Sequence, residues 1–387
     1  MAKIIYVWLI RFFSLISKHL KVKKNLIYLM SFPKNENGLL ASFIEQNPQI
    51  KVTIFYTENC QNDIKRFEEM GAEVYSITQS ISFIKEAVPK CMQAKVILCD
   101  NYFPFFAGLR LHKETTIIQL WHANGAIKRF GLEDPAAMSR SYFDKMRFKQ
   151  VYQHFDEYLV GSEMMGQVFQ NSYGAPKESI IPIGYPRSDV YFKKDMIQQK
   201  RTNFYASFPE LVGKKIILYA PTYREDKLEN YPLDIKQLYE NLGNDYVLIM
   251  KKHPHVVTPI VENRYEGFFY GNVFDFSIED LLVVTDCLIT DYSSIPFEFT
   301  LLDNAKKIIF YCYDQTYYEQ HTGIQKDFKE WAPGVIVSSM DEVIASIKQE
   351  DQVDFTEFNQ KWNTYNDGHA KKRVMAHIQN KYKDFLS

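Results

Sequence analysis

Short apolar runs rich in β-branched residues recur through the first half of the chain, each followed by a span long enough for a helix. They occupy residues 25–32, 51–56, 73–77, 95–99 and 115–120, and residues 156–160 and 179–183 have the same character. Such runs are typical of strands buried in a parallel sheet, and their alternation with helices predicts a doubly wound α/β domain. A polar, lysine-rich helical pattern over residues 190–208 ends this half.

The same alternation starts afresh after Pro209. Its apolar runs lie at residues 214–219, 246–250, 268–270, 287–289, 307–311 and 335–337. The pattern therefore predicts an α/β protein with two Rossmann-like domains, residues 25–208 and 209–387, facing each other across a cleft. Residues 355–385 have a helical pattern with a break at 366–368, and the last helix could pack back on the first domain.

The N-terminal residues 1–24 form a different pattern. Residues 4–20 are apolar, but Arg11 lies at their centre and no small-residue cleavage site follows, which argues against a membrane span or a signal peptide. We predict an amphipathic helix in the membrane plane, with aromatic side chains in the interface and basic side chains on anionic headgroups of the cytoplasmic leaflet. The expected membrane contacts are Trp8, Arg11, Phe12, Phe13 and Lys18. The alternative is a helix that packs its apolar stripe on the neighbouring domain.

Residues 138–155 also mix basic and apolar side chains. They are compatible with a second membrane-contacting surface or with a solvated helix packed on the domain.

Composition adds few constraints. With 387 residues, 46% hydrophobic and 24% charged, the chain is globular and can bury two cores. A formal net charge of −1 gives no global reason to expect nucleic acid, so an anionic partner must be bound by local basic clusters. The five cysteines form no CxxC pair, which is typical of reduced, structural thiols in a cytosolic protein.

Cations and hydroxyls follow neighbouring strands of the second half where each strand ends. These residues are Arg224, Lys252, His253, Thr290, Asp291, Ser293 and Ser294, with Glu298 about one helical turn further on. Because the carboxyl ends of parallel strands share one edge, and a helix N-terminus there favours phosphate, we predict a binding site for a nucleotide diphosphate. Two simpler interpretations remain open: a surface ion pair for Arg224 and ordinary helix capping for residues 290–294.

His122 is the candidate catalytic residue of the first half. It follows the strand at residues 115–120 and precedes small residues that would leave room for a substrate, and a histidine is the usual general base near neutral pH. Asp100, after the strand at residues 95–99, could orient it. The alternative is a histidine hydrogen-bonded within the fold. Candidate groups for an acceptor substrate are Asn101, Asn124, Lys128 and Arg129.

Taken together, these motifs resemble the CDP-glycerol glycerophosphotransferase family of teichoic acid synthesis. They are DNYF (100–103), WHANG (121–125), FGLED (130–134), GSE (161–163), IGYPRSD (183–189), YAPTYR (219–224), KKHP (251–254) and ITDYSSIPFEF (289–299). They follow the family's order over residues 95–315. The resemblance implies a GT-B-like fold and a peripheral enzyme on the cytoplasmic face of the membrane. It also implies that His122 acts on the acceptor side and that His253 contacts the donor diphosphate.

Within the family, the WHANG motif and the absence of a long extra N-terminal domain resemble the priming branch rather than the chain-extending polymerases. The implied donor is CDP-glycerol, and the implied acceptor is an undecaprenyl-diphosphate-linked disaccharide at an anionic membrane surface. No nucleic acid, certain cofactor or metal is expected, since Asp286, Asp291 and Glu298 make no convincing ligand set. The alternatives are a polymerase of the same family, a glycosyltransferase using a nucleotide sugar, and a non-catalytic nucleotide-binding membrane protein.

Overall fold

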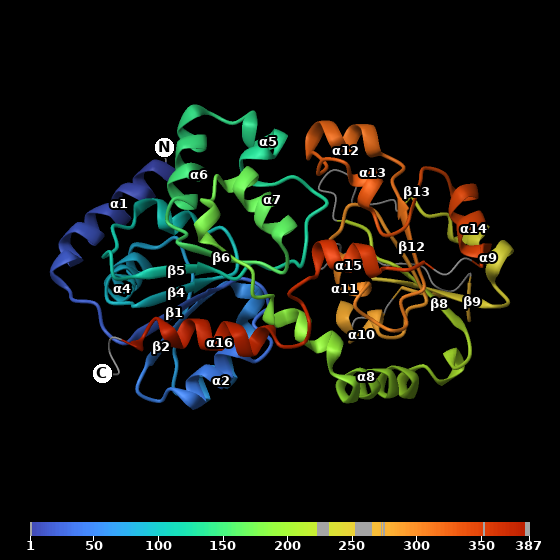
Figure 1. Cartoon of the computed structure of the whole chain (residues 1–387), viewed down its shortest axis with the longest axis horizontal. Helices are drawn as coiled ribbons and strands as arrows, with labels where there is room; N and C mark the ends of the chain where they lie inside the picture. Colours follow the sequence, from blue (N-terminus) through green and yellow to red (C-terminus); the bar gives the residue numbers. More distant parts are fainter. Residues whose placement is uncertain are drawn as a thin grey trace. The chain divides into compact units, whose positions relative to one another are not determined.

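The computed structural model describes residues 2–222, 232–251, 265–271, 273, 275–350 and 353–383. The chain forms two compact units (Figure 1). Unit 1 comprises Met1–Asn124, Phe130–Asp189 and Asn363–Ser387, and unit 2 comprises Gly125–Arg129 and Val190–Trp362. The chain therefore enters unit 2 briefly at residues 125–129, before the main crossing at residue 190, and its C-terminal segment returns to unit 1.

Unit 1 is built on a seven-stranded sheet of order β3-β2-β1-β4-β5-β6-β7. The strands are β1 (Asn25–Met30), β2 (Lys51–Tyr56), β3 (Glu73–Ser76), β4 (Val96–Cys99), β5 (Thr116–Gln119), β6 (Glu157–Leu159) and β7 (Ile180–Ile181). All of them pair in parallel, so the predicted strands are confirmed, some with ends shortened by one or two residues. The strand order reverses between β1 and β4, which is where α/β sheets of this kind bind ligands.

The helices of unit 1 cover this sheet (Figure 1). They are α1 (Ala2–Ile16), α2 (Leu39–Gln46), α3 (Gln61–Glu69), α4 (Ile81–Met92), α5 (Pro135–Met138), α6 (Tyr142–Tyr152), α7 (Glu163–Tyr173) and α16 (Ala370–Asn380). One core joins β1 and β2 to α2, α3 and α16, and it contains Tyr28, Ile54, Leu40, Phe67 and Ile378. The C-terminal helix α16 is thus part of the unit 1 core although 190 or more residues separate it from the strands of that core.

The return of the chain to unit 1 is fixed by the IGYPRSD motif. The Asp189 carboxylate accepts hydrogen bonds from the backbone N–H groups of Ala370 (3.0 Å) and Lys371 (2.8 Å) at the start of α16. Gly184 has φ +84°, and a Cβ there would lie 2.2 Å from the Tyr365 carbonyl oxygen, so only glycine fits. The helix break predicted at residues 366–368 falls in this turn, between α15 (Thr356–Trp362) and α16.

Unit 2 contains a six-stranded sheet of order β10-β9-β8-β11-β12-β13. The strands are β8 (Lys215–Tyr219), β9 (Tyr246–Met250), β10 (Phe269–Tyr270), β11 (Cys287–Thr290), β12 (Lys307–Tyr311) and β13 (Val335–Val337). The helices, besides α15, are α8 (Lys194–Ser207), α9 (Ile235–Leu242), α10 (Ile278–Leu282), α11 (Ile295–Phe299), α12 (Gln315–His321), α13 (Phe328–Trp331) and α14 (Met340–Lys348). The pairings are again parallel, and the strand order reverses between β8 and β11.

Helix α1 packs on the rest of unit 1 through the side that carries Ile10 and Ser14. Ile10 and Ser14 are fully buried, and α1 approaches the short helix Pro104–Gly108 so closely that a Cβ on Gly108 would lie 2.6 Å from the Ile10 Cβ. The aromatic stripe points outward, with Trp8 62% and Phe12 57% exposed. The alternative in which the apolar stripe packs on the domain is therefore wrong for these two residues. Lys18 is exposed, and Arg11 and Phe13 are half-buried.

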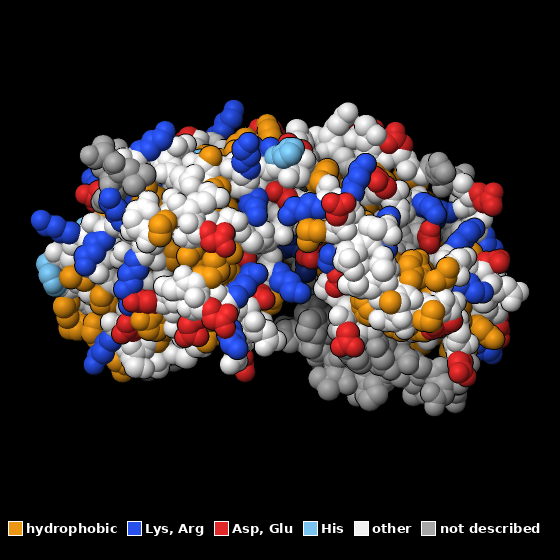
Figure 2. Space-filling model, turned by 90° about the horizontal axis from the view of Figure 1, so that it is seen from below, with side chains coloured by type: hydrophobic (Ala, Val, Ile, Leu, Met, Phe, Trp, Pro, Cys, Tyr) orange, Lys and Arg blue, Asp and Glu red, His pale blue; other side chains and the backbone are white. Residues whose placement is uncertain are grey.

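The surface carries mixed charge. Basic and acidic side chains are interspersed over the face seen in Figure 2, with apolar side chains in small groups between them. All five cysteines are buried and none forms a disulfide. In the part of the chain that the structure describes, no helix combines the length and apolar character needed to cross a bilayer.

Candidate active site

His122 lies just after β5, at the carboxyl edge of the unit 1 sheet. Its ring Nδ1 is 2.7 Å from the backbone carbonyl oxygen of Asp100, which follows β4. A carbonyl only accepts hydrogen bonds, so Nδ1 carries the proton, and a neutral ring then presents its lone pair at Nε2. The Phe32 ring stacks on the imidazole with centroids 3.9 Å apart and planes at 10°. The surroundings therefore fix both the orientation and the tautomer that a general base needs.

The backbone just before His122 is strained. Trp121 has φ +58°, a left-handed conformation that bulky residues rarely adopt. Two side chains hold it there, since Gln119 Oε1 accepts from the Trp121 N–H (3.0 Å) and Asn35 Nδ2 donates to the Trp121 carbonyl (2.7 Å). The indole also stacks on the His122 ring at 4.3 Å. Strain of this kind persists only where the surroundings over-determine it, and it is common at active sites.

The Asp100 carboxylate is engaged with the segment that ends and follows β1. It is fully buried and accepts hydrogen bonds from the Ser31 N–H (2.9 and 3.0 Å), the Phe32 N–H (3.0 Å) and the Tyr28 hydroxyl (3.1 Å). Burial raises the pKa of this carboxyl to about 6. Asp100 therefore positions His122 through its backbone carbonyl, while its carboxylate holds the loop after β1. The contact between Asp100 and His122 is thus made by the backbone carbonyl and not by the carboxylate.

The predicted acceptor residues Asn101 and Asn124 lie on the His122 side. Asn101 is half-buried, directly after Asp100, and its Oδ1 accepts from the Tyr102 N–H (2.8 Å). Asn124 is fully buried, and neither atom of its amide has a hydrogen-bond partner among the described residues. An unsatisfied buried amide is costly and is typical of a group kept for a ligand.

Lys128 and Arg129 are placed elsewhere. Their segment, Gly125–Arg129, belongs to unit 2, where the Arg129 N–H donates to the Gly323 carbonyl (3.0 Å) and Lys128 forms an antiparallel bridge with Ile324. These two predicted acceptor residues therefore belong to unit 2, whereas His122 belongs to unit 1. Lys128 is exposed and Arg129 half-buried.

The small residues of the WHANG motif serve packing. A Cβ on Gly125 would lie 2.2 Å from the Phe297 ring of α11, and Ala126 is only 7% exposed. The expected room for a substrate after His122 is thus occupied, at Gly125, by an aromatic side chain.

Sequence reasoning missed Phe32, Asn35 and Arg187. Arg187 Nη1 donates to the His122 carbonyl oxygen and lies 3.4 Å from Asn35 Oδ1. Phe32 and Asn35 follow β1, one of the two strands at the point where the strand order reverses. Applying the strand-end rule to β1 would have found both residues, and Arg187 is part of the IGYPRSD motif.

At the carboxyl edge of the unit 2 sheet, Thr290 and Asp291 bind the backbone of the segment that follows β8. The Thr290 hydroxyl is fully buried and donates to the Ala220 carbonyl (2.7 Å). Asp291 is 3% exposed, and its Oδ1 accepts from the N–H groups of Thr222 (2.8 Å) and Tyr292 (2.6 Å). Both residues thus hold the ends of β8 and β11 together. The hydroxyl of Thr290, a predicted donor contact, is thus engaged with the backbone at the end of β8.

Ser293 and Ser294 are half-buried at the same edge. Ser293 Oγ accepts from the Ile295 N–H (3.3 Å), and Ser294 is the N-cap residue of α11 without a capping hydrogen bond of its own. The predicted helix exists with Pro296 in its first turn, but α11 has five residues, so its dipole adds little. Glu298 is 3% exposed within α11.

Three predicted donor residues, Arg224, Lys252 and His253, lie outside the described residues. Among the residues that are described, no three His, Cys, Asp or Glu side chains form a group that could hold a metal ion.

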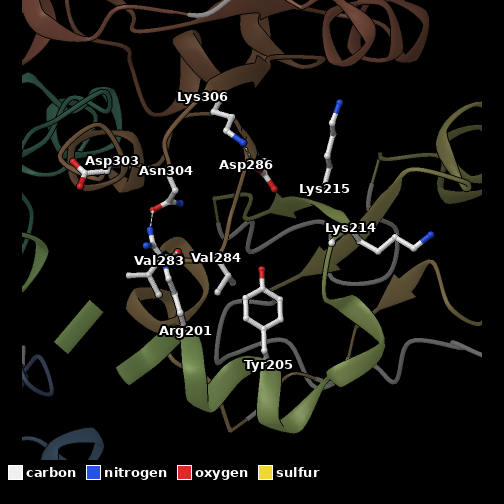
Figure 3. Close-up of a pocket in the computed structure, with 11 residues that line it drawn as sticks. Arg201, Tyr205, Lys214, Lys215, Val283, Val284, Asp286, Asp303, Asn304 and Lys306 are labelled. Atoms are coloured by element: carbon white, nitrogen blue, oxygen red, sulfur yellow. Dashed lines mark hydrogen bonds and ion pairs between the residues drawn. The ribbon is translucent and has the colours of Figure 1, made fainter. Parts of the chain in front are cut away.

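A hollow of about 510 Å³ opens at the opposite edge of the unit 2 sheet, beside the amino ends of β8, β11 and β12 (Figure 3). Several of its lining groups bind protein atoms: Lys306 lies 2.6 Å from Asp286, and Arg201 donates to the Val283 carbonyl (2.7 Å) and to Asn304 Oδ1 (2.9 Å). The hydrogen bonds of Arg201 therefore attach α8 to the segments beside the sheet. Ligands of such sheets bind at the carboxyl ends of the strands, so the hollow is not the candidate nucleotide site.

The profile of the family described as "CDP-Glycerol:Poly(glycerophosphate) glycerophosphotransferase" matches residues 12–380. The chain is 32% identical over 378 residues to the teichoic acid glycerol-phosphate primase of Bacillus subtilis (strain 168), covering 97% of each chain. This chain belongs to the CDP-glycerol glycerophosphotransferase family. It is accordingly a transferase of teichoic acid biosynthesis, and the resemblance of its motifs is confirmed.

Two further relatives are informative, one for the share of its length that aligns and the other for its fold. A teichoic acid poly(ribitol-phosphate) polymerase of Bacillus spizizenii is 32% identical over 340 residues, which cover 84% of this chain and 50% of the polymerase. A solved structure of the wall teichoic acid polymerase TagF superimposes with a TM-score of 0.77 at 22% identity, covering 98% of this chain and 94% of that one. The predicted GT-B-like α/β fold with two parallel sheets is thereby confirmed.

Proposed function

We propose that this enzyme transfers glycerol phosphate from CDP-glycerol to ManNAc-GlcNAc-diphosphoundecaprenol and releases CMP, the priming step of wall teichoic acid linkage-unit synthesis. The observation that carries this proposal is the alignment with a glycerol-phosphate primase over 97% of both chains. The ribitol-phosphate polymerase, by contrast, aligns over only half of its own length. We infer addition of one unit from the full-length match with the primase.

His122 is the proposed general base. The Nδ1–H group of His122 donates to the Asp100 carbonyl, so Nε2 would take the proton from an acceptor hydroxyl. The hydroxyl oxygen then bonds to the phosphorus that carries glycerol, the bond from that phosphorus to the CMP oxygen breaks, and CMP leaves with the electron pair. Asn101 and Asn124 would bind hydroxyls of the acceptor, and the buried, unsatisfied amide of Asn124 supports this assignment.

The donor is proposed to bind at the carboxyl edge of the unit 2 sheet. Ser293 and Ser294 lie at that edge after β11, and Arg224, Lys252 and His253 follow β8 and β9 in the chain. These cations would stabilise the charge that develops on the diphosphate oxygens as CMP leaves. Asp291 would act by fixing the β8 and β11 loops, and Glu298 stays the candidate for a ribose hydroxyl.

The acceptor is a membrane lipid, so we propose a peripheral enzyme on the cytoplasmic face, bound to an anionic surface. The outward aromatic stripe of α1 supports this, because exposed aromatic side chains beside lysine and arginine are typical of interfacial helices. A variant with Phe12→Ser and Leu15→Ser should bind anionic vesicles at least about tenfold more weakly in cosedimentation, since two large apolar side chains leave the interface. Unchanged binding would contradict the role of this stripe.

The priming function is tested by the product. The enzyme is incubated with CDP-glycerol and a short-chain lipid-linked disaccharide, and the masses of the products and the CMP released are measured. We expect one added glycerol phosphate for each CMP. A ladder of additions would show a polymerase, a sugar increment from a nucleotide sugar would show a glycosyltransferase, and no CMP release with any acceptor lipid would show a non-catalytic protein.

A further inference from the structure

An apolar groove of about 250 Å³ lies between α1 and α6 in unit 1. Its walls are formed by Ile4, Val7 and Trp8 of α1 and by Phe143 and Met146 of α6, and its polar lining by Lys3, Arg11, Arg147 and Gln150. No Asp or Glu among the described residues lines it. Large apolar side chains around it stay in solvent, with Trp8 62% and Phe143 71% exposed. A groove with apolar walls and a cationic lining fits an amphiphile with a hydrocarbon chain and an anionic group.

Arg11 is the least compensated of the cations that line this groove. Arg11 Nε is buried and makes no hydrogen bond within the described part of the chain. Burial and the nearby charge of Arg11 lower the pKa of Arg110, and neither guanidinium pairs with a carboxylate that the structure describes. Arg147 does have a partner, since it lies 2.5 Å from Asp144. A bound anion would therefore relieve Arg11 and Arg110 most.

Helix α6, which forms one wall of the groove, also contacts the loop after β4. The Phe148 ring of α6 contacts the Tyr102 ring at 5.7 Å, edge to face. Tyr102 and Asn101 directly follow Asp100, whose carbonyl oxygen holds His122. An apolar groove with a cationic lining and the candidate base thus both lie in unit 1, and α6 with the loop after β4 connects them. A lipid-linked sugar has the same order, namely hydrocarbon chain, diphosphate and reacting hydroxyl.

We propose that the groove between α1 and α6 binds the isoprenoid chain of the lipid-linked acceptor, with the diphosphate beside Arg11. This inference rests on the proposed function, because it needs a polyprenyl-diphosphate acceptor. The outer residues of α1, including Phe12 and Leu15, do not line the groove and contact the bilayer instead. Binding the chain in the groove would position the disaccharide on the side of unit 1 that carries His122.

The test compares two acceptors with the same diphosphate disaccharide, one with a long isoprenoid chain and one with a short alkyl chain. Steady-state kinetics are measured in detergent micelles at saturating CDP-glycerol. The groove variant is Ile4→Ser with Phe143→Ser, and the matched control is Ile81→Ser with Val212→Ser, two exposed apolar side chains that line neither the groove nor the outer stripe of α1. All four side chains are about half or more exposed, so both variants should fold, which circular dichroism checks.

We expect the groove variant to raise KM for the long-chain acceptor about tenfold, roughly the effect of losing two buried methylene contacts. Its kcat and its kinetics with the short-chain acceptor should not change, and the control variant should match wild type with both acceptors. An unchanged long-chain KM, or equal losses with both acceptors or in both variants, would overturn the proposal. A groove that binds only bilayer phospholipid would give weaker vesicle binding with an unchanged KM, which also overturns it.

Arg11→Gln tests the diphosphate contact. It should raise KM for both acceptors, since both carry a diphosphate, while KM for CDP-glycerol stays at the wild-type value. A change confined to KM for CDP-glycerol, or no change in either KM, would contradict this contact. If the wild-type enzyme transferred glycerol phosphate to neither acceptor, the proposed function itself would fail, a result distinct from loss of long-chain preference.

Discussion

The carboxyl edges of the two sheets carry similar sets of polar residues but use them differently. In unit 1, the buried Asp100 carboxylate, Asn35 and Gln119 all support one half-buried histidine. In unit 2, Thr290 and Asp291 bind the backbone of neighbouring strand ends, and Ser293 and Ser294 lie at the edge. A polar residue after a strand thus either holds neighbouring backbone in place or is left to bind a substrate. The outcome depends on whether backbone N–H or carbonyl groups lie within reach of its side chain.

The largest expected effect on turnover comes from replacing His122, the residue that the unit 1 edge holds in place. His122→Ala should lower turnover by about 10²- to 10⁴-fold, the usual contribution of a general base. His321→Ala is a matched control, because His321 also places Nδ1 on a backbone carbonyl (2.8 Å, Tyr317) and stacks on an aromatic ring. Initial rates of CMP release measure both. A near-normal rate for His122→Ala, or an equal loss for His321→Ala, would remove the assigned role.

Removing the buried Asp100 carboxylate should lower the stability of the protein. Asp100→Ala leaves the N–H groups of Ser31 and Phe32 and the Tyr28 hydroxyl without their acceptor, which should lower the free energy of unfolding by about 3 kcal/mol or more. Asp63→Ala is the control, since it removes one exposed hydrogen bond to the Lys34 N–H and should cost under about 1 kcal/mol. Urea unfolding measures both, and equal losses would contradict the supporting role.

The same support has a defined pH dependence. Burial raises the pKa of Asp100 from 3.8 to about 6, so between these values the folded state binds a proton that the unfolded state has released. The stability advantage of wild type over Asp100→Ala should therefore fall as pH rises from about 4 to about 6 and stay level above that. An advantage that grows with pH over this range would show that the ionised carboxylate is the favoured form.

At the unit 2 edge, replacing the buried hydroxyl of Thr290 should affect stability, whereas replacing the hydroxyl of Ser293 should affect donor binding. Thr290→Val removes a buried donor and leaves the Ala220 carbonyl unpaired, which should cost about 1–2 kcal/mol of stability without changing KM for CDP-glycerol. Thermal or urea unfolding and donor kinetics on the same variant check this. A raised KM with unchanged stability would restore Thr290 to the donor site.

The smallest effect is expected for the surface hydroxyl. Ser293→Ala should raise KM for CDP-glycerol about two- to tenfold, the value of one lost hydrogen bond, and leave stability within about 0.5 kcal/mol of wild type. Thr290→Val is its natural comparison. Loss of stability without a change in KM would show that Ser293, too, only supports the loop.

Every strand of both sheets could be predicted, because buried parallel strands leave continuous apolar runs bounded by polar loops. His122 stood out for the same reason, as a titratable residue directly after such a run. The functions of Asp100 and Thr290 could not be predicted, since they depend on which backbone groups from distant segments face them. The return of α16 to unit 1 depends on Asp189 accepting from residues about 180 positions later, a contact that no local pattern shows.

The central claim is that the two edges divide the work, with the acceptor activated by His122 and the donor bound at the Ser293–Ser294 edge. Calorimetric titration of CDP-glycerol into His122→Ala tests this most directly. We expect a Kd within about twofold of wild type, because no donor contact is removed. A Kd weakened tenfold or more in a folded variant would show that His122 binds the donor and would contradict the division.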